Sequence, residues 1–425
     1  MDMTICLYAI SETSQAAYTS GTESQFVRDD FIRIVYLNNI PEEKTSIEII
    51  FFLFFMLSDS MEIFIPLYFK KNGLSAVTYG SLQSVTTILR MAVIWIMAKP
   101  KMKNKRRILE LFVVINMLHF GFLYMNGKFF AFYIFAVFIL TRTVVNTVLN
   151  PYLARLLPND FMGIGFGVRD VFLSVGCAAG LFISGFLEEN LLWFSIYMIV
   201  LLAALLFIMI NTKFIEIAKV DTDDSEDDED AEKTLKSWRD IPKRMKVNFV
   251  IIVAIGCLIA CGLEIHTYSA MIGEDFGVKA QNIYNLYASS VIITAVFSIG
   301  GGIIIDRVNS KIMYLAYILV CFLSCFALVF RTPYAYALSL VFIGIKGVLD
   351  NVEQTYFFKA YKEYDMEKLY SVNTIIQMIL AIVSPMVFGF LYDVNFNLML
   401  MAGIVCLAAA MVVSFGIVDI NKQSE

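Results

Sequence analysis

The nine residues FILTRTVVN at 138–146 recur 204 positions later as FIGIKGVLD at 342–350, and GFLE at 185–188 recurs at the same offset as GFLY at 389–392. Both pairs lie in or at the ends of long apolar segments, and the first pair carries a cation at the same place in each copy, Arg142 and Lys346. An internal repeat of this length predicts two similar halves. Two parallel halves in a membrane, each with a charge at matching depth, favour a protein that moves a solute between them.

The composition predicts an all-α polytopic membrane protein with twelve transmembrane helices in two pseudo-symmetric six-helix bundles. Hydrophobic residues make up 59% of the chain and charged residues only 17%. Apolar segments of about 20 residues recur, each long enough to cross a hydrocarbon core as a helix that satisfies its own backbone hydrogen bonds. The predicted spans are 47–69, 77–98, 108–125, 129–149, 164–187, 191–210, 247–271, 280–305, 312–330, 334–360, 370–392 and 398–418.

Loop charges predict the orientation and the domain organisation. Basic residues crowd 99–107, the central loop and the loops after the eighth and tenth spans, so the positive-inside rule places these loops and both termini in the cytoplasm. We therefore expect a cytoplasmic tail at 1–46, a first bundle at 47–210, a linker at 211–246, a second bundle at 247–418 and a cytoplasmic tail at 419–425. The linker carries nine acidic residues within 221–232, and a segment of that composition is typical of a disordered tether.

The segment GGIIIDRVNSK at 301–311 follows the eighth span and resembles the Gly-x-x-x-Asp-Arg-x-x-basic loop signature of the major facilitator superfamily. The resemblance implies that Asp306, Arg307 and Lys311 form a cytoplasmic latch between the halves, because an aspartate can cap a helix N-terminus and pair with an arginine. The equivalent segment of the first half, AKPKMKNKRR at 98–107, keeps the basic residues and lacks the glycine and the aspartate.

Two further segments resemble the same superfamily. Arg142 matches its membrane-buried arginine on the fourth span, with Asn146 where a glycine is usual. The glycines at 167, 176, 180 and 185 match the spacing of the motif associated with antiporters, although Leu181 replaces its proline and Ser184 replaces its first paired glycine. Glycines at helix contacts are also a common packing device, and that interpretation stays open.

The resemblance implies that the first and fourth helices of each half line a central cavity. Ionisable residues lie away from the ends of all four, and each ion would cost about 3 kcal/mol at mid-membrane against lipid. They are therefore expected to face water or one another, in a polar cavity or in internal salt bridges. The candidates for solute binding and proton coupling are Asp59 and Glu62 on the first span, Arg90 on the second, Arg142 and Asn146 on the fourth, Glu264 and His266 on the seventh, Lys346, Asp350 and Glu353 on the tenth, and Gln377 on the eleventh.

These features predict a secondary active transporter of a small polar organic solute, sugar-like or nucleoside-like, working by proton symport through alternating access. A proton-coupled exporter of amphipathic or cationic compounds is one alternative, and a transporter-derived membrane sensor or scaffold is another. Phosphate loops, nucleotide-binding glycines, zinc spacings and nucleophile elbows are missing from the sequence, so we expect no enzyme activity, cofactor or metal site. The expected partners are the solute, protons in preference to sodium, and the lipid bilayer of the cell membrane, with no nucleic acid and a monomeric chain.

Overall fold

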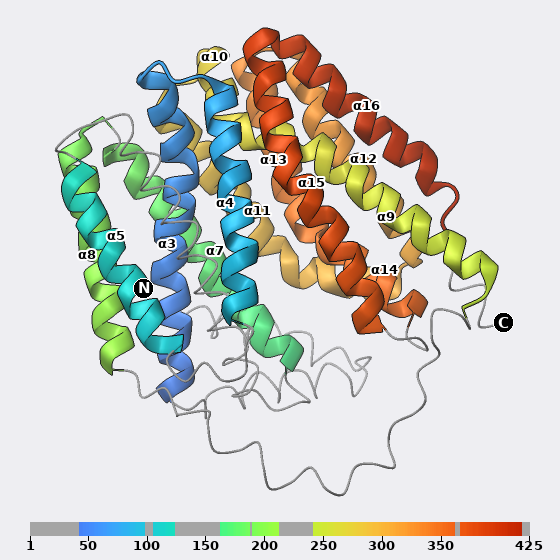
Figure 1. The fold of residues 1–425 in the computed structure, drawn as a ribbon, viewed down its shortest axis with the longest axis horizontal. Coiled ribbons are helices and arrows are strands. Elements are labelled where there is room, and N and C mark those ends of the chain that lie inside the picture. Colours follow the sequence, from blue (N-terminus) through green and yellow to red (C-terminus); the bar gives the residue numbers. More distant parts are fainter. Residues whose placement is uncertain are drawn as a thin grey trace, which may run out of the picture.

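A computed structural model describes residues 42–97, 105–123, 162–187, 189–211, 241–361 and 366–418 (Figure 1). Every regular element in these ranges is a helix: α3 (Glu42–Lys71), α4 (Ala76–Met97), α5 (Lys105–Leu123), α7 (Met162–Leu187), α8 (Leu191–Asn211), α9 (Lys243–Leu263), η6 (Glu264–Tyr268), α10 (Ser269–Asp275), α11 (Ala280–Arg307), α12 (Ser310–Ala327), η7 (Leu328–Phe330), α13 (Pro333–Leu349), α14 (Asn351–Tyr361), α15 (Met366–Val394) and α16 (Phe396–Ser414). Eleven of the twelve predicted spans overlap these helices. The fourth predicted span, 129–149, lies outside the described residues together with Arg142 and Asn146.

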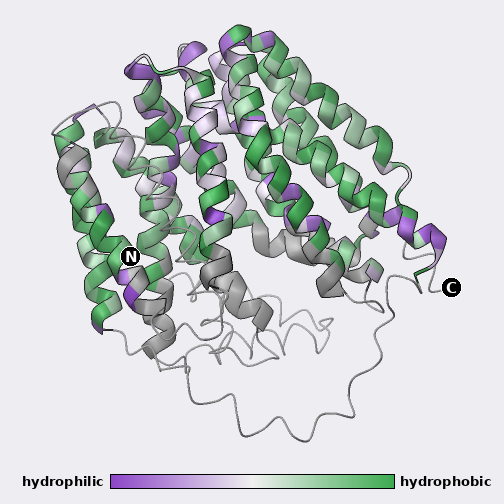
Figure 2. Ribbon diagram, viewed as in Figure 1, coloured by the Kyte–Doolittle hydropathy of each residue, from purple (hydrophilic) through white to green (hydrophobic). Residues whose placement is uncertain are grey.

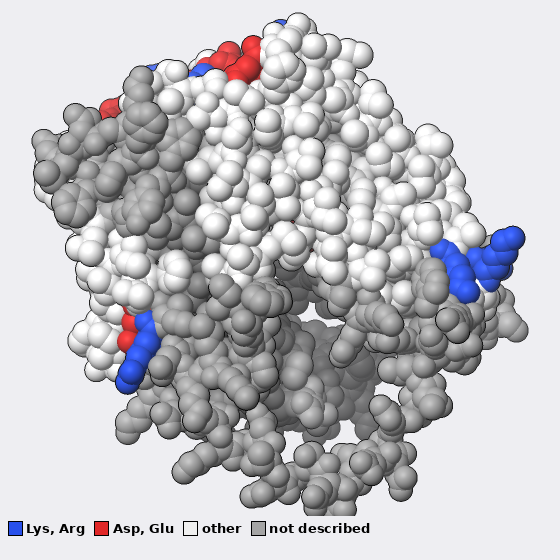
Figure 3. Space-filling model, viewed as in Figure 1, with Lys and Arg blue, Asp and Glu red and all other residues white. Residues whose placement is uncertain are grey.

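The described helices have the length and surface of membrane spans. Six of them are long and apolar enough to cross a membrane: Phe52–Lys71, Leu191–Asn211, Lys243–Asp275, Lys311–Phe330, Val372–Val394 and Phe396–Ser414. Hydrophobic residues dominate these helices (Figure 2). The charged residues visible in the space-filling view lie near its two ends, and the broad middle is uncharged (Figure 3). A surface of this kind suits a hydrocarbon surrounding, in which every exposed charge is costly.

The two ends of the molecule, the hairpin end and the linker end, differ in their chain connections. At the hairpin end, tight turns join α3 to α4 and α10 to α11. At the linker end, α8 ends at Asn211 and α9 begins at Lys243. The two turns have the same backbone design. Gly73 and Gly277 adopt φ values of 68° and 78°, which a residue with a side chain rarely adopts, and each turn is closed by hydrogen bonds to the preceding helix.

The first half is built around the buried helix α3, which packs against α7 and α8. Two glycines of α7 let the helices approach closely, because a Cβ atom at Gly176 or Gly180 would collide with the backbone carbonyls of Phe52 and Met56. These two members of the antiporter-like glycine pattern therefore serve helix packing. Stacked aromatic rings, such as Phe64 and Phe194 with centroids 4.2 Å apart, complete this core between α3 and α8.

The two halves meet where α4 packs against α15 and where α7 packs against α11. The contacts are tightest at the hairpin end. A Cβ atom at Gly389 of α15 would lie 2.6 Å from the carbonyl oxygen of Ala76, and one at Gly185 of α7 would lie 3.0 Å from Cβ of Tyr284. Towards the linker end, α4 and α15 diverge (Figure 1). The described parts of the halves are thus closed together at one end and apart at the other.

Candidate functional site

The seventh predicted span, 247–271, is not one continuous α-helix. It changes at Glu264 from α9 to the 3-10 segment η6, and then to the short helix α10. A 3-10 turn inside a longer helix changes the direction and the hydrogen bonding of the backbone, and such interruptions are frequent at functional sites. The candidate carboxylate Glu264 therefore stands at a break in the helix.

The carboxylate of Glu264 is bound to the eleventh predicted span. Ser384 Oγ on α15 donates to Glu264 Oε2 at 2.7 Å. The next residue, Pro385, accepts a hydrogen bond through its carbonyl from the hydroxyl of Tyr268. Because Glu264 and Tyr268 lie at the two ends of η6, these bonds tie the whole segment to α15.

A layer of tyrosines lies between Glu264 and the hairpin end. Tyr268 packs edge-on against Tyr79 of α4, with ring centroids 5.7 Å apart, and stacks on Tyr392 of α15 at 5.9 Å. Gly80 provides room, because a Cβ atom there would collide with the Tyr268 hydroxyl and the Pro385 carbonyl. The layer therefore joins α4 of the first half to η6 and α15 of the second half.

The second candidate carboxylate, Glu353 of α14, is held in the same way. Gln377 Nε2 on α15 donates to Glu353 Oε1 at 3.1 Å. The pair lies against α9, where a Cβ atom at Gly256 would stand 2.6 Å from Gln377 Nε2 and 3.2 Å from Glu353 Oε1. Gln377 and Ser384 are seven residues apart on α15, which is two helical turns and roughly 10 Å along the axis. One face of α15 therefore supplies uncharged donors to two carboxylates at different depths.

Lys346 and Asp350 form an ion pair at a second interruption. The tenth predicted span, 334–360, divides into α13 and α14 at Asp350. Lys346 Nζ lies 2.8 Å from Asp350 Oδ1 and 3.0 Å from Oδ2. The two side chains are 23% and 45% exposed, so the pair is open enough to exchange partners. Both broken helices of the second half thus place candidate residues at their breaks.

His266 faces away from these carboxylates and into the second half. Its Nε2 lies 3.0 Å from Ser324 Oγ and 3.6 Å from Cys325 Sγ, both on α12. Ser324 and Cys325 are buried, so this histidine contacts the bundle interior. His266 and Glu264 are only two positions apart in the sequence, but their side chains bind different helices, α12 and α15.

The described part of the first half contributes Asp59 and Glu62 of α3 and Arg90 of α4. Asp59 is partly buried, while Glu62 and Arg90 are exposed. Both carboxylates take part in interactions with other residues. The repeat predicts that Lys346 and Arg142 lie at matching depth in the two halves. This stays a prediction, because Arg142 and Asn146 lie outside the described residues.

Two sets of charged residues join the halves at the hairpin end. Lys70 Nζ, at the end of α3, lies 2.5 Å from Asp275 Oδ1 of α10 and 3.7 Å from Glu274 Oε2, and it also donates to the Met271 carbonyl at 2.7 Å. The same Asp275 accepts a hydrogen bond from the hydroxyl of Tyr392. The contacts of Lys70 join the two halves at the hairpin end, whereas the bond from Tyr392 holds Asp275 in place within the second half.

Asp393 forms the second set by capping a helix of the other half. Its carboxylate accepts hydrogen bonds from the backbone N–H groups of Ala76 at 2.9 Å and Val77 at 2.8 Å, which begin α4. A carboxylate at a helix N-terminus satisfies unpaired donors and interacts favourably with the helix dipole. The sequence alone does not mark Ser384, Tyr79, Tyr268 or Asp393 as site residues, because single polar side chains at span ends and on apolar helices form no pattern.

The predicted latch at 301–311 is described only in part. Asp306 and Arg307 lie in the last turn of α11, and their side chains fall outside the description. Lys311 Nζ donates to the carbonyls of Phe415 at 3.1 Å and Ile417 at 2.8 Å, at the end of α16. This contact lies within the second half, so a role of the loop between the halves stays a prediction.

Comparisons with known proteins agree with this architecture. A structure of the nucleoside transporter NupG superposes with a TM-score of 0.67 at 17% identity, covering 88% of this chain and 99% of that one. A POT family transporter in complex with a conjugated peptide gives 0.66 at 13% identity, covering 88% and 95%. A bacterial homologue of the human lysosomal transporter Spinster, inward-facing and unoccupied, gives 0.60 at 13% identity, covering 88% and 94%.

No curated protein matches the sequence. The family model of the Major Facilitator Superfamily matches residues 129–348 and 265–425, which together make up more than half of the chain. Its architecture is the one expected above, twelve transmembrane helices in two six-helix bundles, and its members are transporters and not enzymes. The chain is a multi-pass membrane protein that belongs to the Major Facilitator Superfamily.

Proposed function

We propose that this transporter moves a small polar organic solute, sugar-like or nucleoside-like, by proton symport through alternating access. The observation that carries the proposal is the way Glu264 and Glu353 are held. Each accepts a hydrogen bond from an uncharged side chain of α15, Ser384 or Gln377, and neither has an ion-pair partner among the described residues. A carboxylate of this kind can gain or lose a proton without leaving a buried cation unpaired.

Proton binding at such a carboxylate is coupled to its hydrogen bonds. An ionised carboxylate only accepts hydrogen bonds, whereas a protonated one also donates. Protonation of Glu264 or Glu353 therefore provides a new hydrogen-bond donor to a solute. It also changes the hydrogen bond that the carboxyl group makes with Ser384 or Gln377. Since both partners belong to α15, one helix is affected by both protonation sites.

The same helix connects these sites to the closure of the hairpin end. Before Pro385, Gln377 and Ser384 of α15 bind the two carboxylates. After Pro385, its residues Gly389, Tyr392 and Asp393 contact α4 and α10. A change at the carboxylates can thus bias whether the halves stay closed at this end. In alternating access the two halves rock about a central site, and α15 is placed to link the site to the rocking motion.

The polar groups near the carboxylates support the proposed solute class. Gln377 and Ser384 offer amide and hydroxyl groups, and Lys346 with Asp350 offers a partly exposed ion pair. Hydroxyl-rich rings and nucleobases present matching donors and acceptors. The nucleoside transporter among the similar folds supports this class by analogy of fold alone.

The test uses the purified chain in proteoliposomes that contain a pH-sensitive dye. A thermal-shift screen of nucleosides and sugars first selects a solute, and that solute is then added outside the vesicles. Symport predicts that the lumen acidifies as the solute enters. Glu264→Gln and Glu353→Gln should abolish accumulation driven by a pH gradient and spare solute exchange. Glu189→Gln, at an exposed position of the hairpin end, is the control and should behave like the wild type.

Each other outcome contradicts the proposal in a distinct way. Alkalinisation of the lumen on solute entry would indicate proton antiport and favour the exporter. Solute binding without flux in either direction would favour a sensor derived from a transporter. Full accumulation by the double variant of Glu264 and Glu353 would remove both carboxylates from the coupling mechanism.

A further inference from the structure

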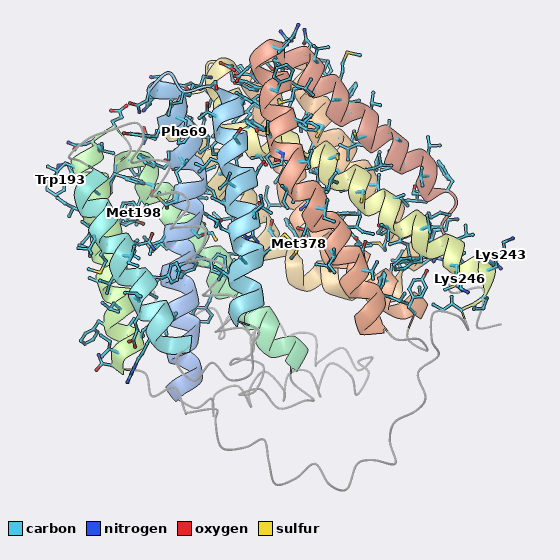
Figure 4. The ribbon with its side chains drawn as sticks, viewed as in Figure 1. Phe69, Trp193, Met198, Lys243, Lys246 and Met378 are labelled. Carbon is cyan, nitrogen blue, oxygen red and sulfur yellow. The ribbon has the colours of Figure 1, made fainter. Side chains whose placement is uncertain are left out.

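A pocket of about 550 Å³ lies at the linker end of the second half, between the start of α9, the start of α12 and the chain that follows α16. Lys243, Arg244 and Lys311 line it. Figure 4 shows Lys243 at the outer end of α9, and Figure 3 shows basic residues gathered there. The lining of the pocket includes neither Glu264 nor Glu353, and the proposed transport mechanism does not use the pocket.

The floor of the pocket is held rigidly by buried polar groups. Asn248 Oδ1 on α9 accepts from the backbone N–H of Val418 at 3.0 Å, and Tyr356 Oη donates to the Val418 carbonyl at 2.6 Å. Lys311 Nζ donates hydrogen bonds to the carbonyls of Phe415 and Ile417. The segment after α16 is therefore fixed against three helices, and the pocket is a shaped part of the fold.

The pocket carries three cations and no carboxylate on its lining. Lys243, Arg244 and Lys311 form no ion pair with any residue in the described part of the chain. The first N–H groups of α9 add to the positive field, because the residue before the helix, Pro242, has no side chain that can cap them. A concave site with this charge selects an anion, and arginine in particular binds phosphate oxygens in a bidentate manner.

The surroundings of the pocket indicate where that anion comes from. Next to it, Val247 and Val250 of α9, Val412 of α16 and Phe415 directly after α16 are each more than half exposed. These residues belong to or adjoin two helices that are long and apolar enough to span the membrane. An occupant with a charged head and apolar chains would place the head among the cations and the chains along these side chains.

We propose that this pocket binds the headgroup of an anionic phospholipid, with its acyl chains lying along α9 and α16. The loop charges predict that the linker end is cytoplasmic, where anionic lipids are concentrated. A lipid in this place would bridge α9, the broken cavity helix that continues to Glu264, and the peripheral helix α16. It would thereby hold the linker end of α9 against its own half.

The test measures which lipids stay with the full-length protein after extraction from mixed bilayers of phosphatidylglycerol and phosphatidylcholine, by native mass spectrometry. The wild type should retain phosphatidylglycerol preferentially. Lys243→Gln with Arg244→Gln should lower this retention by about fivefold for each charge removed, the usual size of one basic residue's contribution. Lys279→Gln with Arg331→Gln removes one lysine and one arginine at the opposite end, and this control should retain lipid like the wild type.

A second variant tests the shape of the pocket without changing its charge. Val247→Trp places a large side chain at an exposed lining position, so it should displace the lipid while leaving the melting temperature in lipid-free detergent unchanged. Equal phosphatidylglycerol retention in the wild type and in Lys243→Gln with Arg244→Gln would overturn the proposal. Binding of soluble glycerol 3-phosphate in detergent, with the same dependence on the two cations and no preference among lipids, would also overturn it and indicate a free phosphate site.

Discussion

The turn between α3 and α4 and the turn between α10 and α11 have the same backbone and opposite charges. Their hydrogen bonds correspond at an offset of 204 residues, from Leu74 to Phe69 in one and from Val278 to Gly273 in the other, and each turn has its glycine at the same place. Where the first turn has Lys70, the second has Glu274 followed by Asp275, and these side chains meet across the halves. The two turns thus share the same backbone geometry but carry side chains of opposite charge.

This comparison shows how two similar halves can close on each other at one end. Near an axis that relates two halves, equivalent positions approach each other, and identical charges would repel there. A lysine facing acidic residues turns the same geometry into an attraction. Substitutions at the positions where the halves differ should therefore show which differences support the closed hairpin end.

The largest effect is expected at the glycines that let the halves touch. Gly389 of α15 and Gly185 of α7 are equivalent in the repeat, but the closest atom to a new Cβ is a backbone carbonyl at 2.6 Å for Gly389 and a side-chain carbon at 3.0 Å for Gly185. A backbone oxygen cannot move aside, so Gly389→Ala should disfavour the closed state by about 1–3 kcal/mol. Gly185→Ala should have a smaller effect.

Pulsed EPR distances between spin labels at Trp193 and Tyr334 would measure this difference. The two positions are exposed near the hairpin end, one in each half. The Gly389→Ala variant should populate longer distances, and the ratio of open to closed hairpin ends should rise by up to a hundredfold. If Gly185→Ala shifts the distances more than Gly389→Ala does, the α4–α15 contact is not the tighter of the two contacts between the halves.

The charge pair should have a smaller effect, of about tenfold, because it is partly exposed to solvent. Lys70→Glu places three acidic groups together and should open the hairpin end. Adding Asp275→Lys restores an opposite pair and should recover most of the closed population in the same EPR measurement. Lys279→Glu, an exposed lysine of the second turn, is the control for the change in net charge. Failure of the reversed pair to recover closure would assign the effect of Lys70 to its bond with the Met271 carbonyl.

Much of this arrangement follows from the sequence. The repeat and the apolar segments predicted the eleven spans that overlap described helices, and the predicted boundaries at Leu187, Leu191 and Ala280 coincide with helix ends. The charge complementarity of the turns was also within reach. The repeat offset of 204 residues pairs Lys70 with Glu274, so opposite charges at the two turns can be read from the sequence.

The helix breaks and the partners of the carboxylates were not predictable in the same way. A 3-10 segment such as η6 has nearly the same apolar pattern as an α-helix, so the break at Glu264 leaves no clear signal. Ser384 and Gln377 are single polar residues on an apolar span, and only the packing of α15 against η6 and α14 shows which carboxylates they bind. The periodicity predicts which helices exist, and tertiary packing decides which polar side chains meet.

The smallest effect is expected at the cap that Asp393 provides for α4. Glu189 is the equivalent residue of the first half, and among the described residues it makes no hydrogen bond with the start of α11. Loss of an N-terminal cap usually costs about 1 kcal/mol, so Asp393→Ala should shift the EPR distance ratio toward the open hairpin end by about fivefold. Glu189→Ala should leave it unchanged, although both substitutions remove one acidic charge at the same end. Because the cap reaches across the halves, its loss should act on closure more than on melting temperature. An equal shift from both variants would mean that net charge at the hairpin end, and not the cap, controls closure.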